Sequence, residues 1–164
     1  MRKVMGVAVL AVLALAVGAR EVAAQTTAQQ NVTFEVAAIN QIAIADAGVT
    51  LVVNSATAGQ APAAVSATSS YSVTTNEVGK KITAKLETDM PAGLTLTLEL
   101  AAPAGGASAG AKVLNGSAAE DLVTGISKLN ETGLTMTYSL SATSAAGVVP
   151  PGNRVVTLTL TDGV

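Results

Sequence analysis

Hydrolytic chemistry in this sequence would have to depend on carboxylates, because the chain contains no histidine and no cysteine. A Ser-His-Asp triad, a thiol nucleophile and a zinc site with nitrogen or sulfur ligands therefore have no residues to form them. Two acidic pairs remain: Glu87 with Asp89, and Glu120 with Asp121. A glycosidase needs two carboxyl groups about 5 to 9.5 Å apart beside a sugar site, which aromatic side chains commonly line. With only two tyrosines, one phenylalanine and no tryptophan in the chain, solvated strand-end and helix-cap charges explain these pairs better than catalysis, and we expect no enzyme.

Oxygen atoms in loops offer a weaker route to binding, through calcium. Asp46, Asp89, Asp121 and Asp162 all lie near expected turns, where carboxylates can reach a Ca²⁺ ion. Their spacing contains no Asp-x-Asp motif. We therefore predict neither a metal site nor a cofactor.

Threonine recurs at every second residue in three segments, which contain the pairs Thr95/Thr97 and Thr135/Thr137 and the triplet Thr157/Thr159/Thr161. A regular hydroxyl array is typical of ice-binding surfaces, but threonine is also favoured on the outward face of ordinary strands. The pairs recur at no constant interval, which favours the second interpretation. Tyr71 and Tyr138 fall in phase with apolar neighbours, so we expect both in the core and not in a row that stacks on sugar rings.

The N-terminus has the pattern of a cleavable export signal. The basic residues Arg2 and Lys3 precede an apolar run over 4–17, and small residues before Gln25 predict cleavage after Ala24, with Ala19 as the alternative. The run is shorter than the roughly 20 residues of a transmembrane helix. We predict a signal peptide over 1–24, no integral membrane span after its removal, and a location outside the cell, on its surface or in the periplasm.

Export would leave an acidic, cysteine-free protein. The chain has nine basic and eleven acidic side chains. Three of the basic and one of the acidic side chains precede Gln25, so six basic and ten acidic side chains remain after cleavage, with a net charge of −4. This charge argues against nucleic-acid binding and provides no basic patch for anionic lipid. An exported protein is in an oxidising location, but this chain has no cysteine to form a disulfide. Its stability must therefore come from packing.

Period-two alternation of apolar and polar residues predicts a single all-β domain over 25–164, with a polar extension over 25–31. The predicted strands cover 32–36, 42–44, 49–53, 71–73, 82–86, 94–100, 134–140 and 156–160. Each has one apolar face, and two stacked sheets would bury all of these faces together. We predict an antiparallel immunoglobulin-like β-sandwich of about 7–9 strands.

Two local features are predicted between these strands. Pro91 and Gly93 are spaced as in a tight turn, so the strands over 82–86 and 94–100 are expected to form a hairpin. Ser117 stands three residues before Glu120, as in a capping box, and Gly125 provides a stop signal, so one short helix is expected between them.

The order of these features resembles that of bacterial fimbrial and biofilm-fibre subunits. An export signal and a polar lead-in precede an alternating segment at Val32, Phe34 and Val36, and a body rich in Ala, Thr, Val and Gly ends with a strand over 154–161. The chain differs from the chaperone-usher pilins, which usually hold a disulfide and a near-terminal tyrosine.

The resemblance implies a structural subunit of a surface fibre or coat that associates with copies of itself or with other fibre subunits. Val32, Phe34 and Val36 would then form a strand-exchange segment that completes a neighbour's sheet. The alternative function is a monomeric extracellular or periplasmic module that binds a glycan or another small ligand.

Overall fold

The computed structural model describes residues 26–163, and the predicted signal peptide lies outside them. Within this range the chain forms strands and a single turn of 3₁₀ helix, η1 (Ser144–Ala146). The strands are β1 (Asn40–Ile44), β2 (Val65–Thr75), β3 (Lys80–Leu86), β4 (Leu94–Leu100), β5 (Ala107–Ser108), β6 (Lys112–Val113), β7 (Glu120–Ile126), β8 (Leu129–Ala142) and β9 (Val156–Asp162).

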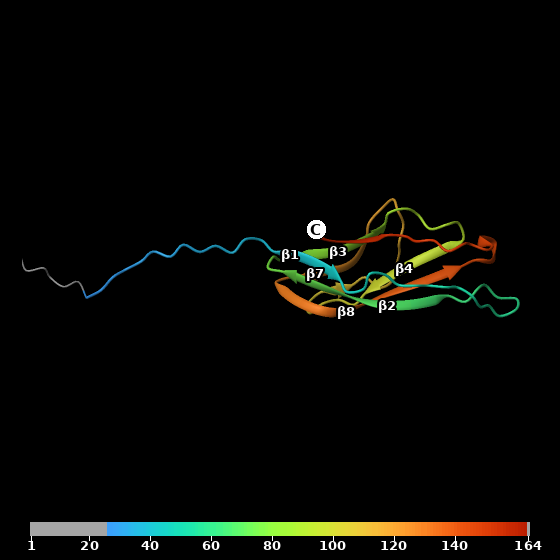
Figure 1. Ribbon diagram of the computed structural model, residues 1–164, viewed down its shortest axis with the longest axis horizontal. Coiled ribbons are helices and arrows are strands. Elements are labelled where there is room, and N and C mark those ends of the chain that lie inside the picture. Colours follow the sequence, from blue (N-terminus) through green and yellow to red (C-terminus); the bar gives the residue numbers. More distant parts are fainter. Residues whose placement is uncertain (1–25, 164) are drawn as a thin grey trace, which may run out of the picture. The chain divides into compact units, whose positions relative to one another are not determined.

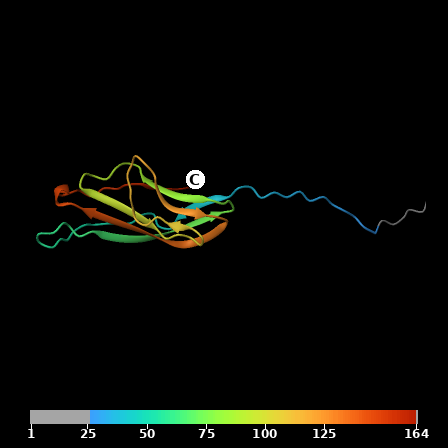
Figure 2. The ribbon, with the colours of Figure 1, turned by 180° about the vertical axis from the view of Figure 1, so that it is seen from behind.

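The strands form two antiparallel sheets that face one another (Figures 1 and 2). The five-stranded sheet has the order β1-β2-β8-β4-β6, and the four-stranded sheet has the order β5-β7-β3-β9. The prediction of an all-β fold built from two stacked antiparallel sheets is confirmed.

Successive strands from β2 to β9 alternate between the two sheets without exception. Each connection is therefore an arch over the core, and β1 and β2 are the one pair of consecutive strands, among those described, that hydrogen-bond to each other. The predicted hairpin is wrong, because β3 lies in one sheet and β4 in the other. Both strands nevertheless point their apolar residues into the same interior, which is why alternation alone does not separate a hairpin from an arch.

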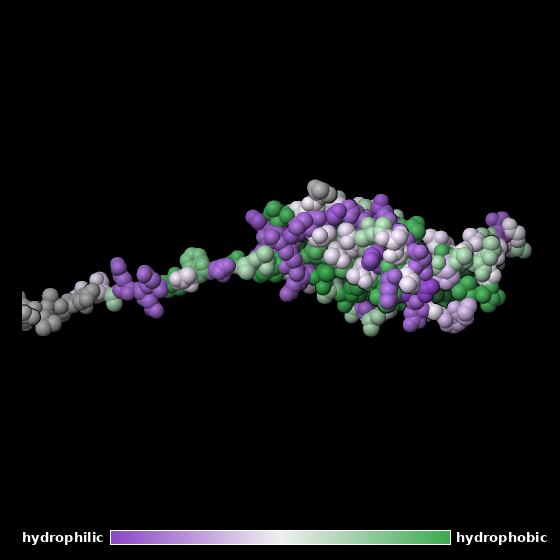
Figure 3. All heavy atoms as spheres, turned by 90° about the horizontal axis from the view of Figure 1, so that it is seen from above, coloured by the Kyte–Doolittle hydropathy of each residue, from purple (hydrophilic) through white to green (hydrophobic). Residues whose placement is uncertain are grey.

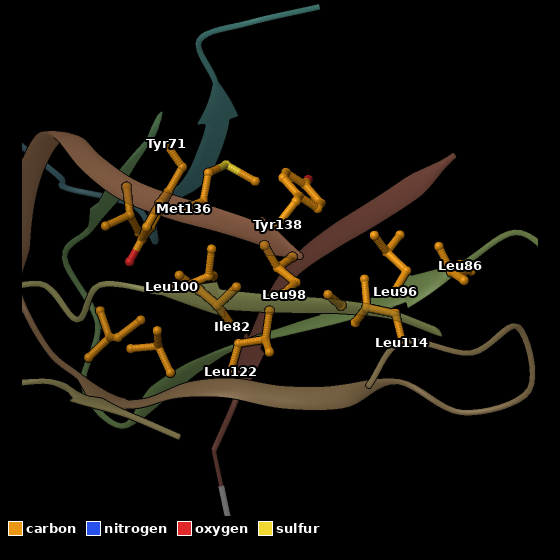
Figure 4. Packing of buried hydrophobic residues seen from close by; sticks show 14 residues of the cluster. Tyr71, Ile82, Leu86, Leu96, Leu98, Leu100, Leu114, Leu122, Met136 and Tyr138 are labelled. Atoms are coloured by element: carbon orange, nitrogen blue, oxygen red, sulfur yellow. The ribbon is translucent and has the colours of Figure 1, made fainter. Parts of the chain in front are cut away.

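The core fills the space between the sheets with residues that alternate along each strand, and Figure 4 shows side chains from both sheets gathered there. Tyr71 and Tyr138 are both buried in it, as predicted. The buried apolar residues are Tyr71, Val73, Ile82, Ala84, Leu86, Leu96, Leu98, Leu100, Leu114, Leu122, Val123, Ile126, Met136 and Tyr138. Leucine, isoleucine and valine supply most of this set, so packing of aliphatic side chains stabilises the fold.

The predicted helix after Ser117 is wrong, because these residues form strand β7. Leu122 and Val123 are adjacent and both fully buried, although neighbouring side chains of a regular strand point to opposite faces. The register against β3 shifts between the pairs Ile82–Val123 and Thr83–Asp121, so Leu122 occupies a β-bulge. Gly125, expected to end the helix, instead has a φ of +73° inside the strand. Pairing with β3 and burial thus override the local capping signal.

The residues before β2 depart furthest from the expected strands. Residues 49–53 form no strand, although Val49 and Leu51 pack against the core. Residues 32–36 also form no strand. The compact unit begins at Val36, and residues 26–35 belong to a separate segment.

Candidate functional site

The outer edge of β9 is an open row of backbone hydrogen-bonding groups. On its inner side β9 pairs with β3 along its whole length, from Lys80–Asp162 to Leu86–Val156. In an antiparallel ladder every second residue turns both its N–H and its C=O toward the partner strand. The flanking bonds fix which residues these are: Glu87 N donates to Val155 O, and Gly163 N donates to Gly79 O.

Odd-numbered residues of β9 therefore bond to β3, and even-numbered residues present their backbone groups outward. Val156, Leu158 and Leu160 carry these outward N–H and C=O groups, which have no partner among residues 26–163. The side chains of the same three residues are half-buried against the core. The outer edge of β9 therefore has both backbone groups that are available for hydrogen bonds and apolar side chains that are only partly buried.

The edge of the facing sheet has the same character. Ala45 N donates to Ser70 O, and Asn76 N donates to Ile39 O, so odd-numbered residues of β1 bond to β2. Ile42 and Ile44 therefore present their backbone groups away from β2. Ile44 is 41% exposed.

A hollow of about 220 Å³ lies between the two edges, lined by Ile42, Ala43, Ile44 and Leu158. Sites for small molecules typically measure about 300 to 1,000 Å³ and contain converging polar groups. This hollow is smaller, and only aliphatic side chains and backbone groups line it, which suits an inserted strand better than a small ligand.

The outer edge of β9 carries few of the features that normally block pairing between molecules. Natural sheet edges are kept short or carry lysine, proline or inward-pointing charge. The other edge strands are β5 and β6, with two residues each, and β1, with five. By contrast β9 has seven residues, Val-Thr-Leu-Thr-Leu-Thr-Asp, whose single charge stands at the end.

The predicted strand-exchange residues are exposed. Val32, Phe34 and Val36 are 75%, 88% and 80% exposed, and Phe34 is the chain's one phenylalanine. In their own chain they belong to no strand of the described part. Their pairing with a neighbouring molecule stays a prediction.

Asn76 fixes the chain where it enters β1. Its backbone N–H donates to Ile39 O, its side-chain oxygen accepts from Ile39 N at 2.8 Å, and its side-chain nitrogen donates to Ala37 O at 2.7 Å. These bonds hold residues 37–39 in line with β1.

A larger hollow, of about 420 Å³, lies next to this entry. It is lined by Ile39, Thr74, Thr75, Asn76, Lys128, Leu129 and Asn130. Its volume falls in the range of small-molecule sites, and its lining offers hydroxyl, amide and ammonium groups but no aromatic ring or carboxylate.

A cluster of charges closes the same end of the fold. The Lys80 ammonium lies 2.5 Å from Asp162 and 2.8 Å from Glu77, and Glu77 also accepts a hydrogen bond from Asn40. The hydrogen bonds that Lys80 donates to Asp162 and Glu77 raise the pKa of Lys80. Those from Asn40 and Lys80 lower the pKa of Glu77. The ion pairs favour the charged forms, so this cluster joins the end of β9 to β3 and is poorly suited to proton transfer.

The acidic pairs named from the sequence lie in the connection after β3 and on β7. Glu87 and Asp89 are both exposed in the connection after β3, and Asp89 accepts a hydrogen bond from Gly116 N at 2.7 Å. Glu120 and Asp121 are consecutive on β7 and so point to opposite faces of the sheet, where Asp121 pairs with Lys81 at 3.1 Å. None of the four lines either hollow.

The four aspartates considered for calcium lie on different elements. Asp46 accepts from Ser69 at 2.7 Å, Asp162 pairs with Lys80, and Asp89 and Asp121 have the partners given above. Residues 26–163 contain no group of three or more acidic, histidine or cysteine side chains that could hold a metal ion.

The threonines likewise do not form one array. Thr95, Thr97, Thr135 and Thr137 lie on the neighbouring strands β4 and β8, whereas Thr157, Thr159 and Thr161 lie in the other sheet, on β9.

Comparisons with known proteins do not place the chain in a family: no family model matches it, and a search of curated proteins found no similar sequence.

None of the helical residues in the described range forms a segment long and apolar enough to cross a bilayer. On the face drawn in Figure 3, apolar residues form separate groups among polar ones. The edges of β9 and β1 are therefore the best candidate for a functional surface.

Proposed function

We propose that this protein is a non-enzymatic structural subunit that is exported, processed after Ala24 and assembled into a cell-surface fibre or coat. Copies, or related subunits, associate by strand exchange or edge pairing. We further propose that the body is an immunoglobulin-like sandwich in the broad sense of two stacked sheets joined by arches. The location is the cell surface, the extracellular space or the periplasm.

The observation that carries this proposal is the unprotected edge of β9. A seven-residue strand with almost no charge is a template for pairing with another chain. In a monomer such an edge promotes unspecific pairing and aggregation. In an assembly a neighbouring strand would cover it. The exposed apolar residues Val32, Phe34 and Val36 supply a segment with matching alternation.

The experiment is size-exclusion chromatography and electron microscopy of the processed chain, residues 25–164. We expect filaments or large species from the wild type and their loss in Phe34→Ser. Glu35→Gln, which changes the polar face of the same segment, is the matched control and retains assembly. A wild-type protein that stays monomeric under all conditions, at concentrations up to its solubility limit, contradicts the proposal.

A second candidate function is binding of a glycan or another small ligand, favoured by the 420 Å³ hollow beside Asn76 and Lys128. Glycan-array binding that is lost in Asn76→Ala, with the protein monomeric throughout, would support this function over the first.

A further inference from the structure

We infer that the outer edge of β9 in one copy of this chain receives the segment Val32–Val36 of a second copy. This inference rests on the proposed function and deepens it, because it names both partners of the contact. The inserted segment would lie beside β9, over the hollow that separates β9 from β1.

The backbone of β9 offers the groups that an added strand needs. At regular intervals Val156, Leu158 and Leu160 each present outward an N–H and a C=O that no other group of residues 26–163 pairs with. A strand that pairs with these groups satisfies them and extends the four-stranded sheet by one member. The two-residue edge strand at the opposite side of that sheet, β5, offers no comparable length.

The side chains of the two segments match in type and period. Along β9, half-buried Val156, Leu158 and Leu160 alternate with threonines. Along the donor, Val32, Phe34 and Val36 alternate with Thr33 and Glu35. Paired with β9, the donor would point its apolar residues toward the hollow lined by Ile42, Ile44 and Leu158, and its polar residues toward water.

The donor is assigned to a second copy because residues 32–36 pair with no strand of their own chain among residues 26–163. Asn76 holds Ala37 and Ile39 in line with β1. Residues 26–39 contain neither glycine nor proline, the residues that most readily make tight turns.

The donor is long enough for this contact. The five residues Val32–Val36 span about 17 Å as a strand, which matches the five residues of β9 from Val156 to Leu160.

The experiment is disulfide trapping between two populations of processed full-length chain, each with a single introduced cysteine in an otherwise cysteine-free sequence. One population carries Thr33→Cys, and the other carries Thr157→Cys, Thr159→Cys or Thr161→Cys, which allows for different registers. The control is Thr135→Cys, exposed on β8 of the other sheet. Adjacent strands bring Cα atoms to about 4.5 to 5.5 Å, within the range of a disulfide.

We expect heterodimers between Thr33→Cys and at least one β9 variant to form about tenfold faster than with Thr135→Cys, because geometry limits disulfide formation. If filaments form but Thr33→Cys cross-links no faster to the β9 variants than to Thr135→Cys, this inference is overturned and the proposed function still holds. No filaments and no cross-links would overturn both. A double variant, Thr33→Cys with Thr159→Cys, that closes only within monomers would overturn the exchange between copies.

Discussion

Lys80 and Asp162 lie directly opposite each other on β3 and β9, and the lysine ammonium lies 2.5 Å from the aspartate carboxylate. The Lys80 side chain is only 9% exposed and also contacts Glu77. This contact ties the last residue of β9 to its inner neighbour. It therefore supports β9 from the side of β3 and leaves the opposite edge free for another strand.

The charge cluster predicts how stability depends on pH. The folded pKa of Lys80 is raised above its ordinary 10.5, so its contribution is complete below 10.5 and is lost as the pH rises through the folded pKa. The folded pKa of Glu77 is lowered below its ordinary 4.5, so its contribution is complete well above 4.5 and is lost as the pH falls through the folded pKa.

We expect Glu77→Gln to flatten the acid side of a melting-temperature profile and Lys80→Met to flatten the alkaline side. The measurement is the melting temperature, followed by circular dichroism, across the acid and alkaline ranges from about pH 2 to about pH 12. Acid and alkaline limbs that keep their wild-type slopes in both variants would contradict the assignment.

Tyr71 is expected to contribute through its hydroxyl as well as its ring. The side chain is fully buried, and its hydroxyl donates to Ala101 O at 2.6 Å. Burial, aided by the charge of Glu131, raises its pKa to about 12, so the donor stays protonated at physiological pH. Tyr71→Phe would lose about 1 to 2 kcal/mol of unfolding free energy, because a carbonyl is left without its partner.

Tyr138→Phe is the matched control for this substitution. Tyr138 is also buried, but its hydroxyl bonds to no other residue of the described range. Urea unfolding is expected to shift by less than about 0.5 kcal/mol in this variant. Equal losses in the two variants would show that the Tyr71 hydrogen bond is not the cause.

Lys128 offers a stabilising substitution. It has a φ of +44° in the two-residue arch between β7 and β8, a conformation that costs a non-glycine residue about 1 to 2 kcal/mol. Lys128→Gly would remove this cost and add chain entropy to the unfolded state, for a net gain of up to about 1 kcal/mol. Lys128→Ala, which removes the same side chain and keeps the strain, is expected to show no gain. A gain of similar size in both variants would assign the effect to the lysine side chain.

The topology predicts slow folding. From β2 onward no strand pairs with its neighbour in sequence, and β2 must find β8 more than fifty residues away. The chain must lose the entropy of closing these long loops before the strand pairing contributes any stability. We therefore expect folding on the millisecond-to-second scale or slower. Refolding that is already complete within the dead time of a stopped-flow instrument would contradict this expectation.

The sequence was sufficient to predict the layers but not the connections. Alternation of Leu96, Leu98 and Leu100 shows which side of β4 is buried, because side chains on a strand point to opposite faces in turn. It does not show which strand lies alongside, since the hydrogen bonds that decide this involve backbone groups common to all residues. The bulge at Leu122 was missed for a related reason: pairing with β3 determined the conformation of a segment whose own residues favour a helix cap.

Of the two parts of the candidate site, the donor segment could be predicted from the sequence and the acceptor edge could not. Val32, Phe34 and Val36 stand out in the sequence because they alternate beside a polar lead-in. The edge position of β9 was missed, since it depends on the order of strands in the sheet. One signal was present: the stretch over 156–161 contains no charge and no proline, which is unusual for an edge that stays in water.

Amide hydrogen exchange across β9 tests the account most directly, because neighbouring residues serve as internal controls. Thr157 and Thr159 bond to β3 and are expected to be protected at every concentration, whereas Val156, Leu158 and Leu160 are expected to exchange fast in dilute protein. As the concentration of the processed chain rises, we expect these three amides to become protected together. Fast exchange at Val156, Leu158 and Leu160 at every concentration would contradict it.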